Sequence, residues 1–297
     1  MTNSLLKKIP ILKNIPKIII NPFFWVIIIG ALLTGQFIEI ITLFGIIFIH
    51  ELGHLFAAES YGWAIKEIQL LPFGGVAHVE PKTDSIKEDL IVAISGPLQN
   101  LLMIIIAFGF EKVHLWSSDW TVFFIKANII IAIFNLIPIS PLDGKRILLN
   151  FLFLFFPVRK SLMMSIFISI VLTLVFLAWS LGFMNEFKIN LNGLLLTVFF
   201  VYNNYMDIKN TPYQFWRFLL KRLENGGKKR SVAAVPIIID KNVKLINALR
   251  LLRKGKYHLY YLLSEDGEII SILPEEKLLK YLTHKKEIYQ PISKLIT

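Results

Sequence analysis

The sequence contains no cysteine, which excludes disulfide bonds and any metal site built on thiolates. Charged residues are also scarce at 18%, whereas hydrophobic residues make up 55% of the 297 positions. This composition is too apolar for an ordinary soluble domain and indicates an integral membrane protein. A zinc ion in this chain would have to be held by histidine and carboxylate side chains.

Acidic residues are absent from the first 17 positions, which carry four lysines, and the formal net charge of the chain is +11. A basic balance can indicate nucleic-acid binding. Here the lysines and arginines gather at the ends of apolar runs and in the C-terminal part, as expected for cytoplasmic segments near anionic lipid. We therefore expect contact with the lipid bilayer and no direct contact with nucleic acid.

Long apolar runs predict a polytopic α-helical membrane protein with about six transmembrane helices. The predicted spans cover residues 18–33, 37–58, 90–110, 122–139, 162–183 and 191–205. The first run lacks a small-x-small cleavage site, so we interpret it as an uncleaved span rather than a signal peptide. The loops near residues 80 and 150 are basic, and those near 35, 115 and 187 are poor in Lys and Arg, which places both termini in the cytoplasm.

The second span carries the motif His50-Glu51-Leu52-Gly53-His54. Histidines four residues apart project from the same face of a helix and can share one zinc ion, with Glu51 beside them as general base. Ionisable side chains are costly in hydrocarbon and usually functional there. We expect Gly53 to leave the helix surface open to metal and substrate. The alternative is that the histidines are hydrogen-bonded core residues.

The third ligand is expected at Asp143, after Pro138 and Pro141 have ended the fourth apolar run. A carboxylate there would complete a His, His, carboxylate site with an open position for water. The alternative role for Asp143 is a helix cap or turn residue, which Asp-Gly alone favours. In the predicted topology, the motif histidines and Asp143 all lie toward the cytoplasmic side of the membrane.

Two other features of the membrane part carry predictions. Apolar residues alternate roughly along residues 65–79, which also contain glycine and proline. This pattern predicts a small β-hairpin after the second span. The hairpin is either a connecting loop or an edge for an extended substrate strand. Asn100 lies in an apolar helix and needs a hydrogen-bond partner, for which we expect a structural role.

The composition changes after the last span. Residues 1–206 are predicted to form the membrane domain, 207–230 an interfacial helix and linker, and 231–297 an α+β domain. The pattern in this last domain predicts strand, helix, strand, strand and helix over 235–239, 243–254, 257–263, 268–273 and 274–282. A domain this small has a thin core, so we expect it to pair with a second copy, making the protein a homo-oligomer.

These motifs together resemble the site-2 protease family of intramembrane zinc metalloproteases. The resemblance rests on the histidine motif, on Pro72-Phe73-Gly74-Gly75, on Ser95-Gly96-Pro97, and on Asn135-x-x-Pro138 followed by Pro141-Leu142-Asp143-Gly144. It implies that His50, His54 and Asp143 bind zinc, that Glu51 is the catalytic base, and that Asn135 and Pro138 shape the substrate cleft. The implied activity is cleavage of a membrane-associated protein near the cytoplasmic face.

The C-terminal domain is similar to a single CBS module. Six spans followed by one such module resemble the subgroup of the family that acts in endospore formation. That resemblance implies cleavage of the pro-sequence of the sporulation sigma factor sigma-K, in the membrane around the forespore, with the active site facing the mother-cell cytoplasm. It also implies inhibitory membrane proteins as partners and ATP at the CBS-like domain.

The competing function is a metal-ion transporter with a nucleotide-sensing domain, because ligands inside spans suit transport as well. A transporter has no need of Glu51 directly after a ligand, and the spans show no internal repeat. A catalytically dead scaffold would not need the full ligand set together with Glu51. The sequence therefore favours the protease.

Overall fold

The computed structural model describes residues 17–20, 33, 35–71, 74–80, 85–182, 189–224, 234–264, 266–283 and 288–296. The chain divides into two compact units. The first comprises residues 1–137 and 142–147, and the second comprises residues 138–141 and 148–297.

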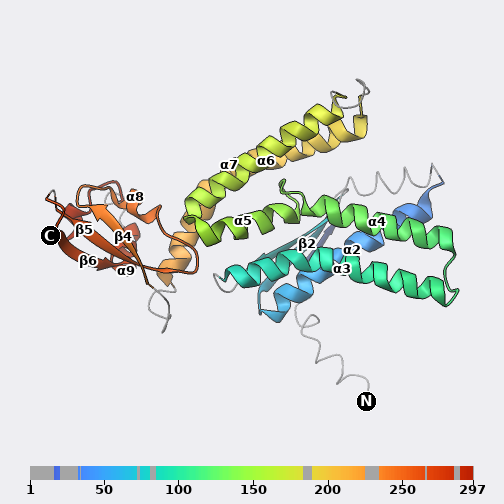
Figure 1. The fold of residues 1–297 in the computed structure, drawn as a ribbon, viewed down its shortest axis with the longest axis horizontal. Coiled ribbons are helices and arrows are strands. Elements are labelled where there is room, and N and C mark those ends of the chain that lie inside the picture. The colour runs from blue at the N-terminus through green and yellow to red at the C-terminus, as the bar shows by residue number, and fades with distance from the viewer. Residues whose placement is uncertain are drawn as a thin grey trace, which may run out of the picture. The chain divides into compact units, whose positions relative to one another are not determined.

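Three long helices form the core of the first unit: α2 (Phe37–Ser60), α3 (Ile86–Lys112) and α4 (Ser118–Leu136) (Figure 1). Helix α3 packs against both α2 and α4. The helices meet in a buried cluster to which each contributes one residue, namely Ile46, Met103 and Ala127. Large apolar side chains such as Ile105 and Ile130 remain exposed on their outer surfaces, as lipid-facing positions would.

A three-stranded sheet joins these helices. Strand β2 (Ala64–Leu71) lies in the middle, parallel to β1 (Lys17–Ile20) and antiparallel to β3 (Gly74–Glu80). The predicted hairpin is therefore confirmed. The prediction that a transmembrane helix begins at Ile18 is wrong, because residues 18–20 are β-branched isoleucines that pair with β2. The rest of that predicted span, residues 21–32, lies outside the described residues.

Three more helices follow: α5 (Asp143–Phe155), α6 (Val158–Ser180) and α7 (Leu191–Glu224). The first residues of α5 belong to the first unit, and the remainder of α5 belongs to the second. Helices α6 and α7 lie side by side (Figure 1). Small polar residues of α6 are buried at four-residue intervals, which allows close helix packing: Ser161, Ser165, Ser169 and Thr173. The amide of Asn204 on α7 donates to Thr173 Oγ1 over 2.8 Å and accepts from Ser169 Oγ.

Among the described residues, four helices are long and apolar enough to cross a membrane: α2, α3, α4 and α6. These are the second to fifth predicted spans, so an integral membrane protein is supported and a count of six is not. The predicted sixth span (191–205) and the interfacial helix predicted within 207–230 are parts of one helix, α7. Asn203 and Asn204 lower the hydropathy of its first half. The predicted linker after Glu224 falls outside the described residues.

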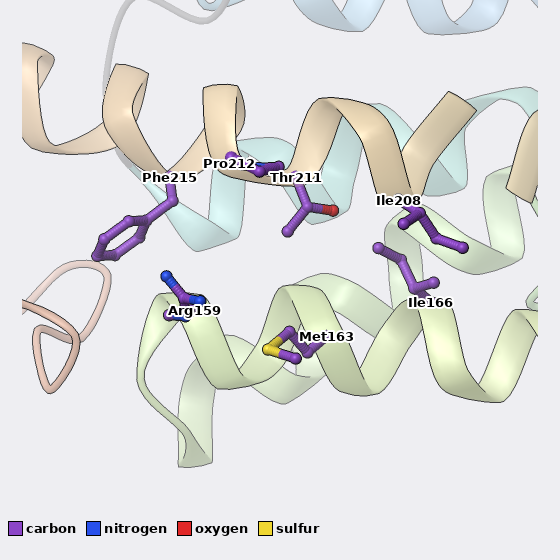
Figure 2. A pocket seen from close by; sticks show the side chains of 7 residues that line it. All are labelled: Arg159, Met163, Ile166, Ile208, Thr211, Pro212 and Phe215. Carbon is purple, nitrogen blue, oxygen red and sulfur yellow. The ribbon is translucent and has the colours of Figure 1, made fainter. Parts of the chain in front are cut away.

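A groove of about 250 Å³ lies between α6 and α7 (Figure 2). Pro212 of α7 has no N–H, so the Ile208 carbonyl one turn earlier receives no helical hydrogen bond. The residues lining the groove are Arg159, Met163, Ile166, Ile208, Thr211, Pro212 and Phe215.

The end of the chain folds as β4 (Ala234–Asp240), α8 (Leu245–Leu249), β5 (Tyr257–Leu263), β6 (Ile269–Pro274) and α9 (Glu275–Lys280), followed by η3 (Tyr281–Thr283) and α10 (Ser293–Ile296). The predicted order of strand, helix, strand, strand and helix is confirmed. Strand β5 lies in the middle, parallel to β4 and antiparallel to β6. Helix α8 is shorter than the predicted 243–254, because the backbone beyond it bonds elsewhere: Leu252 O accepts from Val158 N, and Arg253 N donates to His258 Nε2.

The two faces of this second sheet differ. One face buries Tyr260, Leu262 and Leu273 against α8 and α9. On the other face, Ile238, Tyr261 and Ile272 form a row across the three strands. Ile238 is 66% exposed and Ile272 is 51% exposed. This outer face is apolar and has no covering layer within the described part of the chain.

Candidate metal centre

Three side chains from two helices converge at one point of the first unit. His50 and His54 lie on the same face of α2, and Asp143 is the first residue of α5. Asp143 Oδ2 is 3.0 Å from His50 Nε2 and 3.1 Å from His54 Nε2, and the two Nε2 atoms are 3.2 Å apart. Both histidines are buried, at 2% and 7% exposure. The structure thus brings together all three predicted ligands.

The Nδ1 atoms of both histidines, which point away from the cluster, face oxygen acceptors. His54 Nδ1 is 2.7 Å from the Val92 carbonyl, which can only accept, so this nitrogen carries the proton. His50 Nδ1 is 2.5 Å from Oδ1 of Asn100, whose own NH₂ group is directed to the carbonyl and amide oxygens of Asn128. Nδ1 of His50 therefore donates as well.

This assignment leaves both neutral imidazoles with a lone pair on Nε2. With both rings neutral, two imidazole lone pairs and a carboxylate oxygen face one another at about 3 Å. Such a set of acceptors is unfavourable unless a cation lies among them. Tetrahedral ligands held by zinc at about 2.0–2.2 Å would lie about 3.3 Å apart, close to the three separations observed. The residues present therefore fit zinc.

Glycines allow the elements to approach this closely. A Cβ at Gly96 of α3 would overlap Nε2 of both His50 and His54, so any larger residue there would fill the metal position. A Cβ at Gly144 would overlap the Leu136 carbonyl at the end of α4. Glycine at position 144 thus lets the start of α5, with Asp143, pack against the end of α4.

Two further contacts hold the first turn of α5 in place. Arg146 Nη2 lies 3.5 Å from Asp89 Oδ1 on α3, and the guanidinium carbon lies 5.4 Å from the ring centroid of Trp63. Asp143 is three residues before Arg146, so these contacts fix its helix relative to α2 and α3. Asp143 begins a helix, as its cap-like sequence suggested, and is also part of the cluster.

The prediction for Gly53 is wrong. A Cβ there would lie 2.7 Å from the Ser95 carbonyl oxygen and 2.5 Å from Gln99 Cγ, so Gly53 faces α3. Its role is to let α2 and α3 pack closely, which brings Gly96 and the Val92 carbonyl to the histidines. The space needed for a metal is left by Gly96.

The other predicted residues lie as follows. Glu51 adjoins His50 and is half-buried, close enough to Asp143 for their charges to interact. Asn135 is half-buried in the last turn of α4, next to the Leu136 carbonyl that Gly144 approaches. Pro138 is half-buried in the segment after α4. No described contact joins Asn135 or Pro138 to the histidines, and their substrate role stays a prediction.

Sequence reasoning missed two contributors. Asn128 is fully buried on α4 and binds Asn100, and an asparagine in the middle of an apolar helix was a signal for it. The Val92 carbonyl carries no sequence signal, because a backbone group is the same at every position.

Comparisons with known proteins agree with this geometry. The family model "Peptidase family M50" matches residues 38–117, which include the histidine motif. Stage IV sporulation protein FB of Bacillus subtilis is 30% identical over 265 residues, covering 89% of this chain and 90% of its own length. This chain belongs to peptidase family M50, the site-2 protease family.

Other relatives of this M50 chain are metalloproteases as well. A zinc metalloprotease of Methanocaldococcus jannaschii is 27% identical over 273 residues, covering 89% of this chain and 74% of its own. The solved site-2 protease of the same organism is 28% identical and covers 62% of this chain and 86% of its own, with a TM-score of 0.48.

Family membership makes this M50 chain a metalloprotease of the intramembrane type. Its four apolar helices agree with an integral membrane protein. The transporter alternative receives no support from any of these relatives.

Proposed function

We propose that His50, His54 and Asp143 hold the catalytic zinc of an intramembrane endopeptidase, with Glu51 as its general acid and base. The observation that carries this proposal is the convergence of two imidazole Nε2 atoms and one carboxylate oxygen, 3.0–3.2 Å apart. Zinc bound there would act as a Lewis acid and lower the pKa of a bound water toward 7.

The chain's own residues supply the proton transfers and the positioning. Glu51 takes the proton of the attacking water and passes it to the leaving amine nitrogen. The substrate must arrive extended, because a helix keeps its carbonyls hydrogen-bonded. Asn135 and Pro138 line the cleft beside the zinc in this proposal.

Strand β3 offers a place for an extended substrate. One edge of β2 is already occupied by β1 and the other by β3, so among the described strands β3 has a free edge. An added strand would form main-chain hydrogen bonds along Gly74–Glu80. This supports the hairpin as a substrate edge rather than a plain loop.

The substrate in this proposal is a membrane-associated pro-sigma factor, the precursor of the sporulation factor sigma-K. Support comes from the similarity to stage IV sporulation protein FB over most of both chains. The cleavage would occur in the membrane around the forespore, near the mother-cell cytoplasm. Both termini would be cytoplasmic, and inhibitory membrane proteins would restrain the enzyme.

The C-terminal domain is proposed to be a single CBS-like module that pairs with a second copy and binds ATP at the interface. The order and pairing of β4, β5 and β6 support the module. The apolar row of Ile238, Tyr261 and Ile272 supports pairing, because an exposed apolar sheet face needs a covering layer.

The catalytic proposal is tested by co-expression with a candidate pro-sigma factor. Glu51→Gln should retain zinc but slow cleavage at least about 10²-fold, because general acid and base catalysis contributes that much or more. A gel for the shortened product and metal analysis of the purified protein are the measurements. Cleavage by Glu51→Gln at the wild-type rate would refute the role of Glu51.

Self-pairing is tested on the detergent-purified full-length protein. Ile238→Glu should convert a dimer to a monomer in light scattering, because it places a charge on the apolar face. Leu251→Glu introduces the same charge at an exposed leucine elsewhere in this domain and should leave the dimer intact. A wild-type protein that is monomeric with and without ATP would contradict the proposal.

A further inference from the structure

Two buried asparagines form a hydrogen-bonded chain that ends at the metal centre. Asn128 Nδ2 donates to the Phe124 carbonyl over 2.9 Å, leaving its Oδ1 to accept from Asn100 Nδ2 over 3.2 Å. Asn100 Oδ1 in turn accepts from His50 Nδ1 over 2.5 Å. The chain crosses from α4 through α3 to α2.

The direction of this chain is set at its far end. The carbonyls of Phe124 and Asn128 can only accept, so both side-chain NH₂ groups must be directed toward α4. Asn100 then presents its oxygen, and not its NH₂ group, to His50. Asn100 and Asn128 are fully buried, so water does not compete for these bonds.

We propose that Asn100 and Asn128 are positioning residues that hold His50 in the tautomer with a free lone pair on Nε2. An inverted Asn100 amide would offer an N–H to Nδ1 and move the imidazole proton to Nε2, where it would block a metal. The inference rests on the proposed zinc site and names residues outside the ligand set.

The two histidines differ in how they are held. His54 is oriented by a backbone carbonyl, which no substitution of Val92 removes. His50 is oriented by a side chain that is itself oriented by another side chain. A substitution of the hydrogen-bond partner can therefore change the tautomer of His50 but not that of His54.

The test is zinc affinity of the detergent-purified full-length protein, measured by competition with a fluorescent chelator. Asn100→Leu should weaken binding about 10–100-fold, as loss of a partner to a ligating histidine does. Asn128→Leu should weaken binding less, because Asn100 stays but can invert. The double variant should bind no more weakly than Asn100→Leu alone.

A conservative variant separates positioning from packing. Asn100→Asp restores an acceptor for His50 Nδ1 and should bind zinc more tightly than Asn100→Leu. Asn203→Leu removes a half-buried amide whose NH₂ group donates to the Phe199 carbonyl of its own helix, in the second unit, and should leave affinity unchanged. Additive losses, or an Asn100→Asp variant weaker than Asn100→Leu, would overturn the inference. A wild-type protein without zinc would instead refute the proposed function.

A separate observation concerns the groove between α6 and α7. Its apolar part is formed by Met163 and Ile166 of the spanning helix α6 and by Ile208 of α7 (Figure 2). Arg159, in the first turn of α6, stands at one end, 5.9 Å from the Phe215 ring centroid. No described carboxylate pairs with Arg159, and Arg250 is near enough to repel it.

We infer that this groove binds an anionic phospholipid, with the phosphate at Arg159 and an acyl chain along Met163 and Ile166. An unpaired cation at the end of a membrane helix complements the phosphate, and the apolar residues beyond it match hydrocarbon. The charge of Arg250 acts on Arg159 and adds to the positive potential at this end of the groove.

Native mass spectrometry with added lipids tests this site. The wild type should retain phosphatidylglycerol in preference to phosphatidylcholine, and Arg159→Gln should lose that preference. Lys160→Gln removes the neighbouring charge, which lies over Phe156 rather than in the groove, and should behave as the wild type. Glycerol phosphate should not compete, because it lacks an acyl chain. Equal retention of both lipids, retention by Arg159→Gln, or competition by glycerol phosphate would overturn the site.

Discussion

Each unit of this protein buries histidine beside a carboxylate, but the two clusters differ in their protons. In the second unit, Glu275 accepts from Nε and Nη2 of Arg222, over 2.9 and 2.7 Å, and from the His258 backbone N–H. His258 Nδ1 lies 3.1 Å from the same carboxylate, and its Nε2 accepts from Arg253 N. Every acceptor in this cluster has a donor.

At the metal centre, by contrast, both histidines direct Nδ1 to oxygen acceptors, so that the Nε2 atoms of the neutral rings and the Asp143 carboxylate face one another as three acceptors. Both clusters contain a carboxylate and imidazole, so residue types alone would not separate them. What separates them is whether each lone pair is matched by a proton. The Glu275 cluster, in which each acceptor has a donor, is the complete cluster and holds α7 to the C-terminal domain. The cluster of His50, His54 and Asp143 is the incomplete one and is suited to a cation.

The largest expected effect separates the two clusters directly. Asp143→Asn removes a charged ligand and should reduce zinc from about one per chain to nearly none, because three protein ligands are needed. His258→Ala should leave zinc content unchanged. Metal analysis after purification checks both, and equal zinc loss in the two variants would erase the distinction.

The next effect concerns the space for the metal. Gly96→Ala places a methyl group onto Nε2 of both ligating histidines and should abolish zinc binding and cleavage. Gly109→Ala, on the same helix, meets no atom within 4 Å and should keep both. Zinc content and a cleavage gel distinguish the pair. Full activity in Gly96→Ala would show that the site is roomier than its geometry indicates.

The complete cluster should respond in stability and not in metal content. Arg222→Met leaves Glu275 buried without its cation, which should lower the free energy of unfolding of the C-terminal domain by about 3–5 kcal/mol. Arg217→Met removes a basic side chain that the Glu275 cluster does not use and serves as the control. Thermal unfolding, monitored by susceptibility to tryptic digestion, measures the difference in stability. A melting temperature equal to that of the control would contradict the role of Arg222.

The smallest effect is a pH dependence. Burial alone would raise the pKa of Glu275, but hydrogen bonds from His258 and Arg222 hold it below its ordinary value of 4.5. The ionised form therefore stabilises the fold at neutral pH, and this contribution is lost as the pH falls from about 4.5 through the lowered pKa. Glu275→Gln should lose less stability than the wild type over that interval in acid unfolding curves. Parallel acid unfolding curves for the wild type and Glu275→Gln would contradict this role of the ionised Glu275.

The sequence predicted the parts of the fold and site that depend on local pattern. The shared helix face of His50 and His54, the hairpin, and the order of strands and helices in the C-terminal domain all follow from periodicity and were confirmed. Asp143 could be chosen as third ligand because it is a carboxylate at the end of an apolar run.

What the sequence did not predict depends on pairing across elements. Residues 18–20 are apolar enough for a span, yet they add to the edge of β2, and only the partner strand decides between these outcomes. Gly53 was expected to face open space because the helix packing was unknown. The roles of Gly96 and Asn128 likewise require knowing which atoms of α2 and α3 lie opposite them.

Helix α7 has a mechanical consequence. It is continuous from Leu191 to Glu224, and two of its side-chain attachments, Asn204 and Arg222, lie 18 residues apart, or about 27 Å along the axis. Arg222 is locked into the C-terminal domain, while Asn204 is bonded to Ser169, whose Oγ also accepts from the Ser140 backbone N–H over 3.0 Å. Ser140 precedes Asp143 by three residues. A rotation of the C-terminal domain that turned α7 with it would therefore strain the hydrogen bonds that hold Ser140, three residues before the third ligand.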